Sequence, residues 1–374
     1  MYLVALYIIL LIVAIYIISL LIYITGNLIY SPHRESEKLP SISVIIAAKN
    51  GEKSLPNILS DLNNQNYQGN YEFIIVDDQS NDNTKSIIKE FEEKNRKFKY
   101  ISSIEGDSRL FLKKRALDAG IKKSQYDILL FTDVDCRLKS NWINSMANCF
   151  EKNIDYVIGY SEVSNPSNLI SWFQKIDLLM MMSAGMAAAN LNIPFACSGQ
   201  NQAYKKSLYQ KIGFLKINDS IQGDDTLFLQ LCLKEKIKTR FNNNKKSFVQ
   251  SRMEINILSF IKQRMRWAAD AKIMWTYSKG YFIIILSTFL TNLLLLLSPI
   301  ILFLEYDFMI FLYTLGLIKL ILEFIIYIIG SNKFKTFINP IMFLFWFMIE
   351  IPYVVFVGIG SFFIKYIGWK GQKI

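Results

Sequence analysis

The chain has 374 residues, of which 52% are hydrophobic and 14% aromatic, and its formal net charge is +11. Because the apolar residues gather at the two ends of the sequence, this composition excludes an ordinary soluble protein. His33 is the only histidine in the sequence, so a mechanism that needs a catalytic histidine is nearly excluded.

The excess positive charge lies mostly between residues 34 and 280, next to apolar segments. This placement indicates attraction to anionic lipid and retention on the cytoplasmic side of a membrane. No helix-turn-helix, zinc-finger or RNA-binding pattern indicates nucleic acid as a partner. The cysteines have no C-x-x-C spacing and no nearby histidine, so we expect neither a zinc site nor a disulfide framework.

The first predicted element is a transmembrane helix within residues 1–30. Residues 2–24 are an almost unbroken run of Leu, Ile, Val, Ala and Tyr, and a hydrocarbon core needs about 20 such residues. A cleaved signal peptide fits poorly, because the apolar run is too long and no basic region precedes it.

Short apolar runs alternate with helical patterns in the polar middle of the chain. The runs that read as strands are 42–47, 72–77, 99–102 and 127–132. The helical patterns between them cover 84–95 and 109–122. This alternation predicts an α/β fold with a mostly parallel sheet. Ligands bind beyond the carboxyl ends of such strands, where Asp78 and Asp133 occur.

The second half of the chain is again rich in apolar segments. Residues 168–192 are amphipathic and Met-rich, which suits either a surface for lipid chains or a core helix. Three apolar blocks follow at 281–304, 308–330 and 337–364. The positive-inside rule places the polar middle in the cytoplasm and residues 305–307 outside. The last block contains Pro340, Glu350 and Pro352, so both a kinked span and a re-entrant hairpin fit it.

The segment FTDVD carries Asp133 and Asp135 at the end of an apolar strand. Two carboxylates at i and i+2 point the same way while the chain stays extended. Carboxylate oxygens are ligands that Mg²⁺ and Mn²⁺ prefer, together with substrate phosphates. Such a cation offsets the charge on a departing nucleoside diphosphate. The alternative is an acidic corner between a strand and a loop.

Two further acidic segments follow the same logic. In VDDQSNDNT at 76–84, Asp78 is placed to contact a nucleobase or ribose, while Asn81, Asp82 and Thr84 are expected to cap the next helix. In QGDD at 222–225, a carboxylate is available as a general base. The alternative for Asp224 and Asp225 is that they are negative charges that favour the start of a helix.

The pentapeptide QRMRW at 263–267 places Gln263, Arg266 and Trp267 on one helical face. Arginine binds a diphosphate through paired donors, and tryptophan offers a flat surface at a membrane or sugar boundary. A plain amphipathic helix at the membrane interface is the alternative. It explains Arg264 better than it explains the other three residues.

In this order, the motifs resemble those of the processive and glycolipid-forming members of glycosyltransferase family 2, over most of residues 41–270. The resemblance implies a GT-A nucleotide-sugar domain and a Q-x-x-R-W segment before membrane helices. By position, it implies nucleotide-sugar contacts from Asn50, Glu52, Asp78, Lys113, Asp133, Gln263, Arg266 and Trp267. It further implies Mg²⁺ or Mn²⁺ at Asp133 and Asp135, a catalytic base at Asp225, and acceptor-side residues Gly199, Asn201 and Asp224.

The sequence departs from the family pattern at four positions. In the segment KKRALDAG at 113–120, Asp118 replaces the Asn of the family motif, and Leu112, the residue before this segment, replaces Gly. Gly51 interrupts the usual N-E pair. Asp224 replaces the Glu of the E-D motif, which puts its contribution to acceptor binding in doubt. The assignment of Asp225 as base depends less on that change.

We therefore expect an N-terminal membrane helix at 1–30, a GT-A domain at 38–250, interface helices at 251–280 and a membrane region at 281–374. The expected activity is inverting, metal-dependent transfer from a nucleotide diphosphate sugar, a UDP-sugar, to a membrane lipid. The expected location is a bacterial inner membrane with the catalytic domain in the cytoplasm. The sequence does not indicate the sugar, the acceptor or the oligomeric state.

Two other functions fit parts of the pattern. One is a processive polysaccharide synthase, although such enzymes usually carry more membrane helices. The other is a membrane transporter or scaffold with an inactive nucleotide-binding domain. Such a protein would use the intramembrane ionisable residues Lys319, Glu323 and Glu350. Burial of Lys319 and Glu323 as a pair between helices explains them more simply.

Overall fold

The computed structural model describes residues 2–29, 39–151, 153–163, 165–218, 220, 223–304 and 308–366. His33, Gln222, the 305–307 connection and the basic tail GWKGQKI lie outside the described residues. The chain divides into two compact units. The sheet unit lies within Ser31–Ser164 and Asn192–Arg252, and the apolar unit lies within Met1–Tyr30, Asn165–Leu191 and Met253–Ile374.

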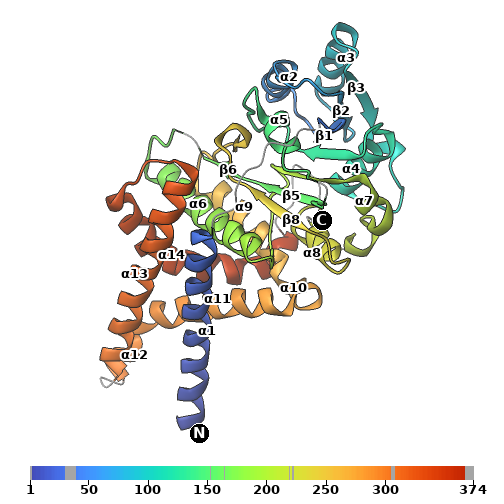
Figure 1. The fold of residues 1–374 in the computed structure, drawn as a ribbon. Coiled ribbons are helices and arrows are strands. Elements are labelled where there is room, and N and C mark those ends of the chain that lie inside the picture. Colours follow the sequence, from blue (N-terminus) through green and yellow to red (C-terminus); the bar gives the residue numbers. More distant parts are fainter. Residues whose placement is uncertain are drawn as a thin grey trace. The chain divides into compact units, whose positions relative to one another are not determined.

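The sheet unit is built on a mixed sheet, for which the described residues supply seven strands in the order β3-β2-β1-β4-β7-β5-β8. Figure 1 labels β1, β2, β3, β5 and β8 of this sheet. The strands are β1 Ile42–Ala48, β2 Tyr71–Asp77, β3 Phe98–Ser102, β4 Ile128–Phe131, β5 Tyr156–Gly159, β7 Gln202–Lys205 and β8 Thr239–Asn242. The strands β1 to β4 pair in parallel, which confirms the predicted α/β fold. The short strand β7 runs antiparallel to β4 and β5.

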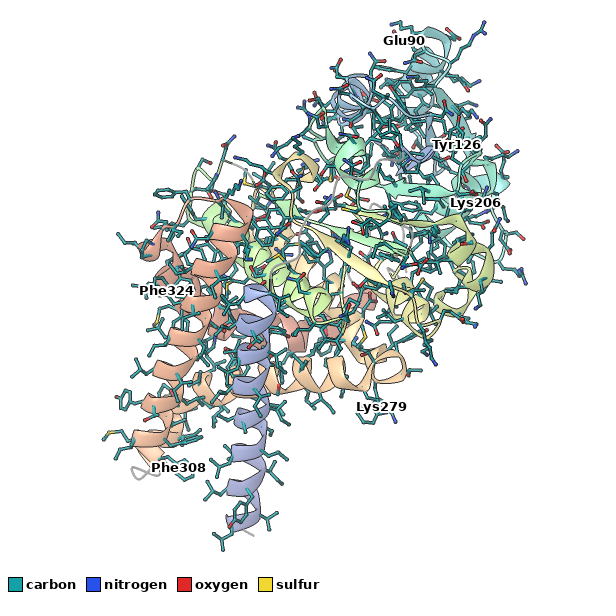
Figure 2. The ribbon with its side chains drawn as sticks, viewed as in Figure 1. Glu90, Tyr126, Lys206, Lys279, Phe308 and Phe324 are labelled. Carbon is teal, nitrogen blue, oxygen red and sulfur yellow. The ribbon has the colours of Figure 1, made fainter. Side chains whose placement is uncertain are left out.

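Helices and short turns complete this unit. They are α2 Leu55–Asn63, α3 Thr84–Lys94, η1 Ser103–Glu105, α4 Leu112–Lys123, α5 Trp142–Ala147, α7 Lys206–Ile212, η2 Leu215–Ile217, α8 Thr226–Leu233 and η3 Lys245–Ser247. The strands β6 Ser161–Glu162 and β9 Val249–Gln250 form a separate parallel pair. Glu90 of α3, which is labelled in Figure 2, has an exposed side chain.

The core explains why the central strands read as continuous apolar runs. In β1, Val44 and Ile46 pack in one cluster with Leu55 and Leu59 of α2, so one face of the sheet is covered. The opposite face meets α4, where a Cβ atom on Gly120 would lie 2.6 Å from Ile45 Cγ2. Strands buried on both faces need apolar side chains at every position, which gives runs rather than alternation.

The apolar unit consists of helices. They are α1 Tyr2–Leu28, α6 Leu169–Asn190, α9 Ile257–Ala269, α10 Ala271–Tyr277, α11 Lys279–Leu296, α12 Ser298–Leu304, α13 Met309–Phe334, α14 Pro340–Gly360 and the 3-10 helix η5 Ser361–Tyr366. Within the described residues, four helical segments are long and apolar enough to cross a membrane: Leu3–Leu28, Lys279–Leu296, Met309–Phe334 and Pro340–Phe363. Figure 2 shows apolar side chains along α13, including Phe324.

This unit resolves two alternatives that the sequence left open, for the last apolar block and for the Met-rich segment 168–192. Residues Pro340–Gly360 form one helix with Pro352 inside it, so a re-entrant hairpin does not occur in this part of the chain. The Met-rich helix α6 is a core helix, because most of its side chains are buried. The backbone of α6 at Ala187 lies so close to Gly26 of α1 that a Cβ atom there would overlap it. Residues 165–191 thus group with the apolar helices, although the predicted range 38–250 included them.

Three ionisable residues within the long apolar helices are paired with one another. Lys319 Nζ lies 2.7 Å from both Glu323 Oε1 and Glu350 Oε2. We call these three residues the Lys319 cluster. Tyr16 of α1 donates a hydrogen bond of 2.7 Å to Glu323, and the Asn292 amide of α11 lies 3.4 Å from Glu350 Oε1. The cluster therefore connects α1, α11, α13 and α14 through polar contacts in an apolar surrounding.

Candidate active site

The topology gathers the predicted site segments at one edge of the sheet. Because β1, β2 and β4 are parallel, the loops that follow Ala48, Asp77 and Phe131 leave from the same edge. Strand β7 is antiparallel to β4, and its first residue Gln202 pairs with Phe131 at the end of β4. The segment before β7, which contains Gly199, is therefore brought to the same edge.

The predicted nucleotide-pocket residues lie on two loops that hydrogen-bond to each other. The Asn50 side chain accepts a hydrogen bond of 2.9 Å from Asn81 N, and Glu52 accepts one of 3.0 Å from Asn83 N. Asp78 is buried, and Lys49 Nζ donates to its carbonyl oxygen at 3.0 Å. Asn50, Glu52 and Asp78 are thus held within one loop pair after β1 and β2.

Asp82 both caps helix α3 and connects the loops that follow β1 and β2. Its Oδ1 accepts from Thr84 N at the start of α3, and its Oδ2 accepts from Glu52 N at 3.1 Å. Burial works against the charged form, but the hydrogen bonds from Thr84 and Glu52 outweigh it and lower the pKa of Asp82. The expected local role of Asp82 extends to holding the β1 loop against the β2 loop.

The FTDVD segment does not stay extended, so one premise of the sequence argument is wrong. Strand β4 ends at Phe131, and Cys136 N donates to Asp133 O at 3.2 Å, which closes a turn through Val134 and Asp135. Val134 is buried beneath this turn. Strand alternation therefore does not set the directions of the Asp133 and Asp135 carboxylates.

Lys113 joins two of the predicted site segments. Its Nζ lies 2.9 Å from Asp133 Oδ1 and 2.9 Å from Asp224 Oδ2. We call these three residues the Lys113 cluster. Burial alone would lower the pKa of Lys113, but the charges of Asp133 and Asp224 outweigh burial and raise it well above its ordinary value. Lys113 stays protonated at any physiological pH.

Lys113 is presented by an unusual start of α4. The preceding residue Leu112 has φ of +55°, and Phe111 provides no side-chain cap. This left-handed conformation favours glycine, which is the residue at the matching position of the family motif. The chain keeps the conformation although it lacks the glycine.

Gly199 and Asp225 adjoin the Lys113 cluster. Asp225 Oδ2 accepts a hydrogen bond of 3.0 Å from Gly199 N, and its Oδ1 accepts one from Thr226 N as the N-cap of α8. A Cβ atom on Gly199 would lie 3.1 Å from Lys113 Nζ and 3.4 Å from Asp224 Oδ2. Asp225 thus caps a helix, as the alternative interpretation expected, and also lies beside the cluster.

Asn201 has a different position. Its side chain is completely buried. Its Oδ1 accepts from Trp142 Nε1, and its Nδ2 donates to Tyr160 O and Ser247 O. The side chain therefore has no free surface for an acceptor. It braces the fold behind Gly199 instead.

The QRMRW segment lies on α9, in the apolar unit. Gln263 donates a hydrogen bond of 3.2 Å to Glu254. Burial lowers the pKa of Arg266, and Glu254 acts in the opposite direction. Trp267 is partly exposed, and the guanidinium of Arg264 lies 4.1 Å from its ring centroid. The three predicted residues therefore share one helix, separate in the chain from the carboxylate segments.

Arg264 and Asp177 were not predicted as a pair. Arg264 is buried, and its Nη2 lies 2.8 Å from Asp177 Oδ2 on α6. Arg264 therefore faces another helix of the same unit, which the alternative of a plain amphipathic helix at the membrane interface does not explain. The signal in the sequence is Asp177 itself, a single acidic residue within the apolar, Met-rich helix α6.

Aromatic rings surround this ion pair. Tyr353 of α14 stacks on Phe260 of α9, with ring centroids 5.7 Å apart. Phe173 of α6 meets both rings edge to face. Three helices that are distant in sequence are thus packed around the Arg264–Asp177 pair.

Comparisons with known proteins agree with this architecture. Residues 43–213 match the family model "Glycosyl transferase family 2". A poly-beta-1,6-N-acetyl-D-glucosamine synthase of Staphylococcus epidermidis is 27% identical over 241 residues, which are 63% of this chain and 55% of that protein. The chain thus spans about half the length of this curated relative.

Two other proteins are similar over more of their length. A Methanococcus voltae enzyme is 26% identical over 270 residues, 68% of this chain and 83% of its own. Its name is dolichyl N-acetyl-alpha-D-glucosaminyl phosphate 3-beta-D-2,3-diacetamido-2,3-dideoxy-beta-D-glucuronosyltransferase. A mannosyltransferase of Pyrobaculum calidifontis, solved with GDP-Man and Mn²⁺, superposes with a TM-score of 0.55 at 14% identity, covering 96% of this chain and all of that one. Residues 43–213 are therefore similar to glycosyltransferase family 2, and the chain has a GT-A-like fold together with helices that are apolar enough to cross a membrane.

Proposed function

We propose that the protein is an inverting, metal-dependent glycosyltransferase that moves a hexose from a nucleoside diphosphate sugar to a lipid acceptor at a membrane surface. The observation that carries the proposal is the meeting of Lys113, Asp133 and Asp224 beside Gly199 and Asp225. These residues come from four separate segments, and the sheet topology brings them to one edge.

Asp225 is the proposed general base. It accepts the proton of an acceptor hydroxyl, whose oxygen forms a bond to the anomeric carbon while the bond from that carbon to the diphosphate breaks. The nucleoside diphosphate leaves with the bonding electrons, and the configuration at the carbon inverts. No covalent intermediate between sugar and protein is formed. The hydrogen bonds from Gly199 N and Thr226 N hold the carboxylate in place.

The residues present fit a divalent cation that is bound both by the protein and by the phosphates of the donor. Among the described residues, no cluster of three or more His, Cys, Asp or Glu side chains is arranged to hold a metal. Asp133 and Asp135 offer hard oxygen ligands, and a site with few carboxylates suits Mg²⁺ or Mn²⁺ that is also bound by substrate phosphates. When bound, the cation would offset the negative charge on the leaving diphosphate.

The donor is proposed to be a UDP-sugar, bound by the loops that carry Asn50, Glu52 and Asp78. Their hydrogen bonds to the neighbouring loop keep them in fixed positions, which reduces the ordering cost of binding a base and ribose. The structurally similar mannosyltransferase was solved with GDP-Man. A donor screen should therefore include both UDP-sugars and GDP-sugars.

The substitution Asp225→Asn tests the base. Asparagine keeps the size and the Oδ1 acceptor that caps α8, but it loses the Oδ2 acceptor of Gly199 N and takes up no proton, so we expect turnover to fall by about 10²- to 10⁴-fold. Sugar transfer to extracted membrane lipids measures turnover, and calorimetric titration with UDP measures nucleotide binding, which should persist. Asp155→Asn is the matched control, because Asp155 pairs with Lys205 outside the cluster. Turnover at the level of the unsubstituted protein would refute the role of Asp225.

A lipid acceptor is supported by the apolar helices and by the dolichyl-linked acceptor named for the relative from Methanococcus voltae. The second candidate is a processive synthase, which the poly-N-acetylglucosamine synthase relative favours. Mass analysis of products from purified protein separates the two functions. Single addition yields one product mass per lipid, whereas a ladder of sugars contradicts it.

An inert transporter or scaffold is the rival from another class. It would need ionisable residues along a path through the membrane. Lys319, Glu323 and Glu350 instead pair with one another in the buried Lys319 cluster, which supports a structural role. Metal-dependent hydrolysis or transfer from a UDP-sugar would exclude a scaffold, and the absence of both would favour it.

The proposed location is a bacterial inner membrane with the sheet unit in the cytoplasm. Support comes from the apolar segments and from the basic residues that accompany them, such as Lys333 and Lys335 at the end of α13. Labelling of engineered surface cysteines in intact cells and in inverted vesicles tests the orientation. A cysteine at the exposed position Glu90 should react only in inverted vesicles.

A further inference from the structure

The feature that points beyond the proposed function is the position of one ammonium group. Lys113 Nζ lies 2.9 Å from Asp133, a proposed metal ligand, and at the same distance from Asp224. Two carboxylates that face each other repel, and a cation between them relieves that repulsion. The chain itself supplies this cation.

We propose that Lys113 is a resident counter-cation that holds Asp133 until a nucleotide arrives, so that metal and nucleotide bind together and the metal binds poorly alone. This inference rests on the proposed function, because it takes Asp133 as a metal ligand. A divalent cation that approaches Asp133 must first displace or repel the ammonium of Lys113. Without another anion nearby, Lys113 has no reason to leave its two partners.

A nucleoside diphosphate changes this balance. Its phosphates offer the ammonium of Lys113 new anionic partners, and they also supply ligands to the divalent cation. Lys113 is attached at the first turn of α4, and its long side chain can turn from Asp133 toward a diphosphate without movement of the backbone. The consequence is positive coupling between metal and nucleotide.

The packing around Lys113 limits where the ammonium can lie. A Cβ atom on Gly199 would lie only 3.1 Å from Lys113 Nζ, so a larger residue at position 199 would crowd it. The side chain is 26% exposed, and that of Asp133 is 29% exposed, so solvent and ions reach the pair. The ammonium is therefore held, but it can still be exchanged.

The test is Mn²⁺ binding to the purified full-length protein, measured from the electron paramagnetic resonance signal of free Mn²⁺ with and without UDP or GDP. Lys113→Met removes the charge and keeps most of the length. We expect this variant to bind Mn²⁺ roughly 5- to 150-fold more tightly than the unsubstituted protein without nucleotide, the usual range for coupling between two sites. Added nucleotide should tighten Mn²⁺ binding to the unsubstituted protein by a similar factor, and much less in the variant.

Lys99→Met is the matched control. Lys99 has a similar exposed fraction and pairs with a single buried carboxylate, Glu72, at 2.6 Å in the same unit. Its substitution should leave Mn²⁺ binding unchanged. Asp133→Asn should abolish Mn²⁺ binding under all conditions, which shows that the signal reports on this cluster.

The outcomes separate the inference from the proposed function. Nucleotide-dependent Mn²⁺ binding with no gain in Lys113→Met overturns the counter-cation role and leaves the glycosyltransferase proposal intact. No Mn²⁺ binding to the unsubstituted protein, even with nucleotide, overturns metal dependence and the inference with it. If Lys113→Met does not fold, amine labelling of the unsubstituted protein decides: excess Mn²⁺ should increase labelling of Lys113 and not of Lys99, and equal labelling overturns the inference.

Discussion

The two units each contain a lysine between two carboxylates, and the surroundings give these clusters different properties. In the Lys113 cluster, the side chains of Lys113 and Asp133 are 26% and 29% exposed, while that of Asp224 is 8% exposed. In the Lys319 cluster, Lys319 is fully buried and each glutamate side chain is 7% exposed. The closest distances are similar, 2.9 Å and 2.7 Å. Solvent access, rather than distance, distinguishes a group that can exchange its partner from one that cannot.

The origin of the two clusters also differs. The Lys113 cluster is assembled from the start of α4, the loop after β4 and the residues before α8, all of which are chain segments at the edge of a sheet. The Lys319 cluster is carried by helix interiors, and Tyr16 and Asn292 extend it. Loop segments at a sheet edge are typical of binding sites, whereas charges buried between apolar helices fix how the helices pack.

Lys319→Met should give the largest difference between the clusters. It leaves Glu323 and Glu350 buried without a counter-charge, and breaking a buried ion pair costs about 3–5 kcal/mol of folding stability. Thermal unfolding in detergent should show a large loss for this variant. Lys113→Met leaves one solvated partner, Asp133, and one buried partner, Asp224, so its loss should be smaller than that of Lys319→Met. Equal losses for the two variants would remove the distinction.

Isosteric neutralisation sharpens the same prediction. The triple variant Lys319→Met, Glu323→Gln, Glu350→Gln removes all three charges and retains the side-chain volumes. Replacing a complete buried ion cluster is often close to neutral, so most of the stability lost in Lys319→Met should return. A triple variant no more stable than Lys319→Met would show that the loss came from packing rather than charge.

The Arg264–Asp177 pair should respond like the Lys319 cluster, although it lies next to the QRMRW residues. Arg264→Met removes the counter-charge of a buried carboxylate, so we expect a stability loss of about 3 kcal/mol. Lys262→Met on the same helix is the control. If Arg264 also positions its neighbours, addition of Asp177→Asn should restore stability but not kcat. Full recovery of both would limit the pair to a structural role.

The smallest expected effect is a pH dependence that comes from Asp177. Burial raises the pKa of Asp177, and Arg264 offsets this only in part. Because the folded-state pKa lies above the unfolded-state pKa, protonation of Asp177 favours the fold below that pKa, and this stabilisation is lost as the pH rises through it. Asp177→Asn should remove this contribution. Denaturation midpoints of both proteins, measured upward from the ordinary pKa of 3.8, provide the measurement, because their difference should change in this direction.

The sequence predicted the fold well where one residue type dominates a segment. Strands β1 and β2 are centred on short runs of Ile and Val, and their observed bounds lie within one residue of the predicted runs 42–47 and 72–77. The same reasoning gave no strand for β7, because QAYK is short and directly follows the predicted acceptor-side residues Gly199 and Asn201. A single antiparallel strand of four residues leaves no clear periodicity in the sequence.

The candidate site was predicted as motifs and not as contacts. Asp133, Asp224 and Lys113 were each named, but their pairing depends on three loops converging, which no local pattern specifies. The buried pair of Arg264 and Asp177 joins residues far apart in the chain, and the third partner of Lys319, which is Glu350, lies on another helix. Helical periodicity gives the face on which a residue lies but does not say which helix that face will meet.

Helix α14 contacts both polar features of the apolar unit through residues less than one turn apart. Glu350 reaches Lys319, and three residues later Tyr353 stacks against Phe260 on the QRMRW helix. Slippage of α14 by one residue would rotate these side chains by about 100° and separate both contacts at once. These two contacts therefore oppose rotation of α14, and a mutation that disrupts one of them should also weaken the other.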